Sequence, residues 1–252
     1  NAHAAGFYIQ EQSVRGLGSA FSGSSTTLDD ASTIYFNPAG MTKLDGMQMQ
    51  AGVNVIAPHA DVENDGSAAP AAALGNVGDE SDNPYKPTPV PNGFFSYQVT
   101  DSLWAGVGVT APFGLGSEYD DGWFGRFDST KTELKIIDVQ PTLAYKVNDM
   151  LSVGAGVNIQ HASADLRNAV LLGAGVEGES QLEGSDYGFG YSLGLQFKPW
   201  QTTTFGIDYK SEVHHDLDGK IQITNAAGAI VGLGTLSTPG KAKLTTPDHL
   251  TL

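Results

Sequence analysis

The chain contains no cysteine and few cations: it has 13 Lys and Arg in 252 residues, against 28 Asp and Glu, for a net charge of -15. The absence of cysteine excludes a disulfide framework, thiol catalysis and cysteine-based zinc sites. So few cations cannot form the basic patch that nucleic-acid binding requires. No run of 18 apolar residues exists, so no transmembrane helix is predicted. The hydrophobic fraction of 40% is nevertheless too high for a disordered chain.

The sequence has instead a period of two. Alternation of apolar and polar residues is typical of a strand with two unlike faces. It recurs in eight segments, the last of them weaker: 47–57, 95–100, 103–111, 137–147, 151–160, 187–197, 203–210 and 241–252. No stretch of similar length has the 3.6-residue period of an amphipathic helix. The chain is therefore predicted to be all-β.

The links between these segments are alternately short and long. Tight turns are expected at 100–102, 148–149 and 198–201, whereas long links are expected at 58–92, 115–133, 165–186 and 212–240. All the long links then fall at one end of the sheet. Loops of about 20 residues or more are unusual in compact soluble domains. Short turns at one end and long loops at the other are typical of a transmembrane antiparallel β-barrel of the outer membrane.

The composition of the two faces bears on the alternative, a soluble β-sandwich. The polar positions are mostly Gly, Ser, Asn, Gln and Thr, whereas the wet face of a sandwich usually carries more charge. Aromatic residues lie near both ends of one segment, with Tyr187 and Phe189 at one end and Phe197 and Trp200 at the other. Such residues form girdles at the two membrane surfaces. The pattern favours the barrel, and the sandwich stays as the alternative.

Residues 1–46 lack the period of two, so the chain divides into this segment and the strands of 47–252. Ala2, His3 and Ala4 match the small-x-small pattern of a signal-peptidase site, which suggests export. One helical turn is expected over 27–32. A folded segment ahead of a barrel is expected either to hang from it as a periplasmic appendage or to sit in the lumen as a plug. The glycine- and serine-rich inner face leaves room for a plug.

Several motifs resemble those of the FadL family of outer-membrane transporters, which carry long-chain fatty acids and, in the TodX branch, aromatic hydrocarbons. Besides Gly6-Phe7 near the start, the runs that match are GLGSAFSG at 16–23, DDAS at 29–32, NPAGM at 37–41, APFGLGSEY at 111–119, WFGRF at 123–127 and TPDHL at 246–250. The first three lie where the family has an N-terminal hatch that plugs the lumen. The family barrel has about fourteen strands. The eight segments found here therefore imply an incomplete barrel, the N-terminal part of a longer protein.

The resemblance implies a transport route: capture in an apolar external groove, transfer to a lumenal pocket at the hatch, and lateral exit through a kinked third strand. The residues that it assigns to ligand binding are Phe7, Ile34, Phe36, Trp123, Phe124, Phe127 and, for a carboxylate head group, Arg167. Those that it assigns to the hatch and its gating, beside the third-strand kink, are Asn37, Pro38, Ala39, Phe113 and Gly114. No basic residue aligns cleanly with the head-group position of the family. The substrate is therefore expected to be either a fatty acid or a neutral hydrocarbon.

Other functions receive less support from the sequence. A surface binding protein, receptor or adhesin on the same scaffold is the main alternative to transport. No enzyme activity, cofactor or metal site is expected, because the glycine-rich run 173–178 precedes no helix and His214 and His215 would point to opposite faces of a strand. The expected partners are a hydrophobic small molecule and the lipid and lipopolysaccharide of the membrane, with no nucleic acid. Divalent cations are a further candidate at Asp120 and Asp121. A monomer is expected.

Overall fold

The computed structural model describes residues 7–26, 29–66, 77–173, 176–225 and 238–252. Most of this part of the chain is strand. The helical elements are α1 (Val14–Gly18), α2 (Thr33–Phe36) and the 3-10 helix η1 (Pro38–Lys43). The strands are β1 (Met47–Ile56), β2 (Thr88–Gln98), β3 (Leu103–Glu118), β4 (Lys131–Lys146), β5 (Leu151–Gly173), β6 (Val176–Trp200), β7 (Thr203–Lys210), β8 (Val213–Asn225), β9 (Thr238–Thr246) and β10 (His249–Thr251). Within the described residues, no helix is long and apolar enough to cross a membrane.

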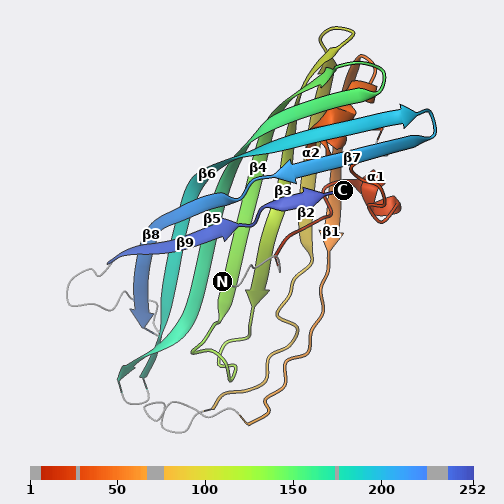
Figure 1. Ribbon diagram of the computed structural model, residues 1–252. Helices are drawn as coiled ribbons and strands as arrows, with labels where there is room; N and C mark the ends of the chain where they lie inside the picture. Colours follow the sequence, from red (N-terminus) through yellow and green to blue (C-terminus); the bar gives the residue numbers. More distant parts are fainter. Residues whose placement is uncertain (1–6, 27–28, 67–76, 174–175, 226–237) are drawn as a thin grey trace.

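The ten strands form one antiparallel sheet in the order β1-β2-β3-β4-β5-β6-β7-β10 (Figure 1). One part of β6 pairs with β7 and the other part with β8, while β9 pairs with β8 and β10 with β7. Thus β7 and β8 follow one strand path, interrupted at 211–212, and β9 and β10 follow the next, interrupted at 247–248. Counted in this way there are eight strand paths, the number that the alternation predicts.

The strands are longer than their alternation predicts. The expected long link at 165–186 is wrong, because β5 and β6 continue through it as a paired hairpin up to Gly173 and Val176. The link at 212–240 is likewise wrong over most of its length, because β8 lies inside it and β9 begins inside it. Beyond the apolar band the outer face becomes polar, as at Ser163 and Asp165, whereas Ala162 and Leu217 belong to an apolar cluster on the inner face. The face that carries the apolar residues changes along the strands, so the alternation of the band does not continue.

The sheet has an apolar outer face and a polar inner face. On the outer face large apolar side chains are exposed, including Met49 at 82% and Phe189 at 69%. On the inner face Gln140, Asn158 and Ser192 are buried. Among the described residues no second sheet covers the outer face, which contradicts the soluble sandwich. An uncovered apolar face is compatible with lipid, where the closure of the strand ladder satisfies the backbone.

The N-terminal segment lies against the inner face, not beyond the edge of the sheet. The side-chain amide of Gln140 donates to the carbonyl of Ile34 at 2.8 Å, and the indole of Trp104 donates to the carbonyl of Leu44 at 2.7 Å. A buried apolar cluster joins the segment to the strands: Phe21, Ala31, Ile34, Tyr35, Phe36, Met41, Phe94, Trp104 and Ala144. The periplasmic appendage is therefore ruled out for the described part of this segment.

The helix of this segment begins later than predicted. The turn expected over 27–32 is wrong for its described part, 29–32, and residues 27–28, like the signal-peptidase motif at 2–4, lie outside the described residues. Helix α2 starts at Thr33, because the carboxylate of Asp30 accepts from both the backbone N–H and the hydroxyl of Ser32 and fixes the preceding turn. Asn37 then caps η1, its side chain accepting from the N–H of Ala39 at 3.0 Å.

Candidate transport site where strands β2 and β3 separate

The wall of the sheet is interrupted between β2 and β3. The two strands pair only from Gln98 opposite Trp104 to Gly93 opposite Val109. Beyond that point β3 pairs with β4 alone, and its register against β4 shifts between Thr110 and Phe113. Pro112 lies in this bulge and has no N–H to donate to a neighbouring strand. The irregularity predicted around Phe113 and Gly114 thus lies just before them.

The N-terminal segment occupies the free edge of β3. The N–H of Ile9 donates to the carbonyl of Pro112 at 2.8 Å, and the N–H of Gly114 donates to the carbonyl of Phe7 at 3.0 Å. Tyr8 lies opposite Phe113 as an isolated antiparallel bridge. Residues 7–9 therefore take the place in the ladder that β2 vacates.

The side chain of Gln12 completes this replacement. Its amide nitrogen donates to the carbonyl of Ala111 at 2.8 Å, and its amide oxygen accepts from the N–H of Ala111 at 3.0 Å. The side chain is fully buried. It supplies the donor and the acceptor that a neighbouring strand would give, so that neither backbone group of Ala111 is left unpaired. The sequence analysis missed Gln12, because a glutamine in an irregular segment carries no periodic signal.

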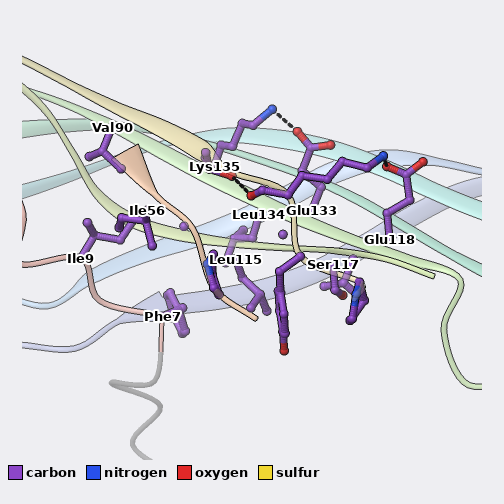
Figure 2. A pocket seen from close by; sticks show the side chains of 18 of the residues that line it. Phe7, Ile9, Ile56, Val90, Leu115, Ser117, Glu118, Glu133, Leu134 and Lys135 are labelled. Carbon is purple, nitrogen blue, oxygen red and sulfur yellow. Dashed lines mark hydrogen bonds and ion pairs between the residues drawn. The ribbon is translucent and has the colours of Figure 1, made fainter. Parts of the chain in front are cut away.

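A cavity of about 570 Å³ lies at the separation (Figure 2). Its lining includes Val90, Leu115 and Leu134 from the inner face and Lys135 from the outer face, together with Phe7. The lining thus includes side chains from both faces of the wall, at the point where β2 and β3 separate.

An ion pair closes the far end of this opening. Lys86 Nζ lies 2.6 Å from Glu118 Oε2, and the N–H of Glu118 donates to the carbonyl of Pro84 at 2.8 Å. The hydrogen bond from Lys86 holds the pKa of Glu118 below its usual range. The opening is thus bounded by the last β2–β3 pair at one end and by this ion pair at the other.

A second cavity, of about 360 Å³, lies on the inner face. Tyr8, Tyr35 and Phe113 form an aromatic side, and the opposite side is polar: Asp138, Asn158, Gln160, Lys210 and His249. Lys210 Nζ lies 2.7 Å from Asp208 Oδ2 and 4.7 Å from the centre of the Tyr35 ring. Lys210 is a cation in the interior that the sequence analysis missed. Tyr8 lines both cavities, so the N-terminal segment lies between them.

The structure brings only some of the predicted residues to these cavities. Phe7 and Gly114 line the cavity at the separation, and Phe113 lines the inner one. Ile34 and Phe36 are buried in the core between the N-terminal segment and the strands and line neither cavity. In this structure these two apolar side chains therefore serve the packing of the core.

Arg167 lies on the outer face, away from both cavities. Its guanidinium lies 2.9 Å from the carboxylate of Asp165, on the same strand. Since side chains alternate along β5, the inner-face side chains near it are Ala164 and Leu166. In this structure Arg167 thus does not reach a ligand in the lumen.

The predicted external aromatic residues pack inside the link 119–130. The ring of Trp123 is buried and stacks on that of Tyr119, with 3.8 Å between centroids and 4° between planes. Phe124 contacts Trp123 at 5.0 Å, and Phe127 lies under the guanidinium of Arg126 at 4.6 Å. None of the three predicted residues, Trp123, Phe124 or Phe127, lines either cavity.

The predicted brace at 37–39 lies against a different part of the wall. The side-chain nitrogen of Asn37 donates to the carbonyl of Leu195 on β6 at 3.2 Å and to that of Ile207 on β7 at 3.3 Å. Gly154 on β5 lets Pro38 approach the strand, because a Cβ at that glycine would lie 2.5 Å from the Pro38 carbonyl carbon. The expected position of Asn37, Pro38 and Ala39 beside the third-strand kink is wrong for this reason.

The uncovered apolar face, the long links at one end and the filled inner face define the wall of an outer-membrane β-barrel. A family model described as "Outer membrane protein transport protein (OMPP1/FadL/TodX)" matches residues 1–252, so the chain belongs to this family and to the outer membrane. Two relatives are a putative outer membrane protein of Neisseria meningitidis, 32% identical over 100% of this chain and 60% of its own length, and the long-chain fatty acid transport protein of Escherichia coli K12, 29% identical over 86% and 54%.

Solved structures of the family share the fold. A Pseudomonas aeruginosa FadL homologue has a TM-score of 0.76 and 20% identity, covering 97% of this chain and 64% of its own. The Ralstonia pickettii toluene transporter TbuX has a TM-score of 0.62 and 22% identity, covering 88% and 61%. The chain thus spans between half and two thirds of the length of these relatives. The sheet is part of a barrel, as the strand count predicts.

Proposed function

We propose that the protein carries hydrophobic small molecules, long-chain fatty acids or hydrocarbons, across the outer membrane. Residues 7–46 act as a hatch, the inner cavity holds the ligand, and the cavity between β2 and β3 is the exit into the lipid. The observation that carries the proposal is the interrupted ladder, where a cavity lies beside residues 7–9, which with the side chain of Gln12 occupy the free edge of β3.

A sideways exit suits the energetics of such a ligand. Each methylene group that returns from an apolar site to water costs about 0.8 kcal/mol. A chain of twelve methylenes would therefore face a barrier on the order of 10 kcal/mol in a watery channel. A route through the wall keeps the chain in contact with apolar side chains until it reaches lipid.

Lys210 is the residue that we propose for a carboxylate head group, in place of Arg167. It lines the inner cavity, and its partner Asp208 is buried. A fatty-acid carboxylate would compete with Asp208 for the ammonium, whereas a hydrocarbon would leave that pair intact. Lys210→Met combined with Asp208→Asn, which leaves no unpaired buried charge, should therefore lower uptake of fatty acids several-fold and leave uptake of toluene unchanged.

The gate is tested by a crosslink between residues 8 and 113. Because the flanking hydrogen bonds join 9 to 112 and 7 to 114, residues 8 and 113 form a non-hydrogen-bonded pair, whose Cα atoms are typically about 4.5 Å apart. That spacing suits a disulfide. The variant Tyr8→Cys with Phe113→Cys, expressed in a strain that lacks the gene, should lose uptake when oxidised and recover it when reduced.

Controls are available because the chain has no cysteine of its own. The single variants Tyr8→Cys and Phe113→Cys remove the same side chains without a crosslink, and their uptake should not respond to the oxidant. Full uptake by protein whose crosslink is verified by mass spectrometry would contradict the proposed exit.

The transport function is favoured over a surface receptor or adhesin. The aromatic side chains of the link 119–130 are turned into the link, as the burial of Trp123 shows. They therefore form no exposed aromatic groove for a macromolecular partner there, whereas the two cavities are of small-molecule size.

A further inference from the structure

We propose that the outer face of β4, β5, β6, β8 and β9, just beyond the apolar band, binds the phosphorylated sugar head group of an outer-leaflet glycolipid of the lipopolysaccharide class. The proposal rests on the outer-membrane location of the family and not on the transport route. It concerns the face of the wall that is turned away from both the hatch and the inner cavity.

The register of β5 and β6 shows where the apolar band ends. Ile159 lies opposite Phe189, and His161 lies opposite Tyr187 with 4.7 Å between ring centroids. The next outward-facing pair is Ser163 opposite Ser185. Aromatic rings at the border and small polar residues above it are typical of the membrane surface.

Above this border the outer face is hollowed. The cavity there has a volume of about 560 Å³, and its polar lining is Glu133, Ser163, Asp165, Glu183, Ser185, Asp218 and Lys220. Ser163 and Ser185 are the shortest of these side chains and lie side by side in the register, so they form its floor. Lys135 pairs with Ser163 on one side, and Asp218 pairs with Ser185 on the other.

Cations and carboxylates are mixed around this hollow. Six of the 13 Lys and Arg lie on these five strands with their side chains on the outer face: Lys131, Lys135, Arg167, Lys220, Lys241 and Lys243. Lys131 and Arg167 are held by Asp165 at 2.7 and 2.9 Å, and Lys241 is held by Asp218 at 2.8 Å. The carboxylates thus hold ammonium and guanidinium groups on both sides of the hollow, at the height where lipid head groups begin.

Three of these lysines keep free donors for an anion. The side chains of Lys135, Lys241 and Lys243 are 64%, 78% and 89% exposed. Each ammonium has three N–H donors, of which a carboxylate partner uses one or two. Neighbouring strands are about 4.8 Å apart, so Lys135 on β4 and Lys241 on β9 stand on opposite sides of the hollow and can engage phosphates at two ends of one head group.

The acidic lining indicates which groups, besides phosphates, the bound head group carries. Among the described residues, no group of three or more acidic or histidine side chains is placed to hold a metal ion. The carboxylates and serine hydroxyls of the lining can accept further hydrogen bonds, which the hydroxyl and amide groups of a sugar provide. Acyl chains attached below such a head group would lie along Tyr187 and Phe189. A phospholipid supplies the phosphate and the acyl chains but few hydrogen-bond donors, so it matches the lining less well.

The test measures lipid binding by the full-length protein in detergent, by native mass spectrometry with diphosphoryl lipid A as the probe. The variant Lys241→Gln with Lys243→Gln should weaken binding by roughly thirty-fold. Each cation near an anionic lipid surface contributes a similar share of the binding free energy, and two are removed. The matched control, Lys146→Gln with Lys198→Gln, removes two cations at the tight-turn end and should leave binding unchanged.

A second variant keeps every charge. Ser185→Trp fills the hollow on an exposed strand position where an aromatic residue is tolerated, and it should weaken lipid A binding to a similar extent. Folding is checked by heat-modified migration on gels, and uptake should be normal in both variants. Equal lipid A binding by all folded variants would overturn the proposal. So would wild-type binding of dephosphorylated lipid A or phosphatidylglycerol as tight as that of diphosphoryl lipid A.

Discussion

The β5–β6 hairpin and the β2–β3 pair satisfy the hydrogen-bonding groups of their backbones in different ways. β5 and β6 remain paired from Leu151 opposite Phe197 to Gly173 opposite Val176, with one irregularity near the tip. β2 and β3 share only six pairs before they separate. Where the ladder is complete, the backbone needs no further hydrogen-bond partners. Where it is interrupted, the free edge of β3 takes partners from the N-terminal segment, since an unpaired group in lipid is costly.

The N-terminal segment consequently has two unlike attachments. At 37–39 it is held to the complete part of the wall, by Asn37 and by close packing on glycine. At 7–12 it is held to the interrupted part, by two backbone hydrogen bonds and the side chain of Gln12. The first attachment joins parts of the protein that do not separate, and the second joins parts that open in the proposed route. Three substitutions test this contrast, and a change of pH tests a separate contact of the wall, at the link 119–130.

The largest effect is expected at Asn37. Asn37→Asp replaces a nitrogen that donates to the carbonyls of Ser25, Leu195 and Ile207 with a carboxylate oxygen that faces the same three acceptors. A buried, unpaired charge should lower the free energy of unfolding by about 3–5 kcal/mol, measured by urea titration in detergent. Asn148→Asp is the control, because Asn148 serves as an exposed acceptor for Met150 and Leu151 and should be indifferent to the change.

The second effect is expected at Gln12. Gln12→Leu keeps the volume but leaves the N–H and carbonyl of Ala111 without these partners, and each unsatisfied group costs about 1–3 kcal/mol. Hydrogen exchange should increase at residues 7–12 and not at 37–39. Gln10→Leu changes an exposed glutamine two residues away and should leave exchange as in the wild type. Increased exchange at both attachments would mean that the segment is released as one unit.

The third effect is expected at Gly154. Gly154→Ala places a methyl group against the carbonyl carbon of Pro38 and should lower the free energy of unfolding by about 1–3 kcal/mol through displacement of the 37–39 turn. Gly93→Ala, on β2, is the comparison, because the nearest atom to its Cβ would be the carbonyl oxygen of Gln50 at 4.0 Å. Equal thermal stability of the two variants would argue against close packing at the first attachment.

The smallest effect concerns pH. The hydrogen bond from Arg126 lowers the pKa of Glu177, which joins the link 119–130 to the tip of β6. Because the folded pKa is lowered, the stabilisation is complete above the ordinary pKa of 4.5 and is lost as pH falls through the folded value. Proteolysis of the link should therefore accelerate at low pH, by an amount equivalent to about 1 kcal/mol or less. In Glu177→Gln this acceleration should be absent.

The sequence contained enough information for the strand paths but not for the site. The period of two predicts the apolar outer face, because lipid and lumen impose opposite requirements on alternate residues such as Phe189 and Gly190. It did not predict the upper halves of β5 and β6, where the outer face becomes polar and Ala162 and Ala164 make the inner face of β5 apolar. Gln12 and Lys210 were missed because their roles depend on contacts across 99 residues and on a cavity that only the folded sheet creates. Trp123 and Ile34 were assigned to ligand binding from chemistry that serves packing equally well.

The position of Tyr8 between the two cavities has a consequence for how the exit would be opened. Its ring stacks on His249 and contacts Phe113, and its hydroxyl meets that of Tyr35 at 3.2 Å. A ligand that enters the inner cavity must compete for these same surfaces. Each contact that it takes over weakens the attachment of residues 7–9 to β3. In the proposed route the ligand itself therefore weakens the attachment that closes the exit, and its affinity for the membrane favours its movement into the lipid.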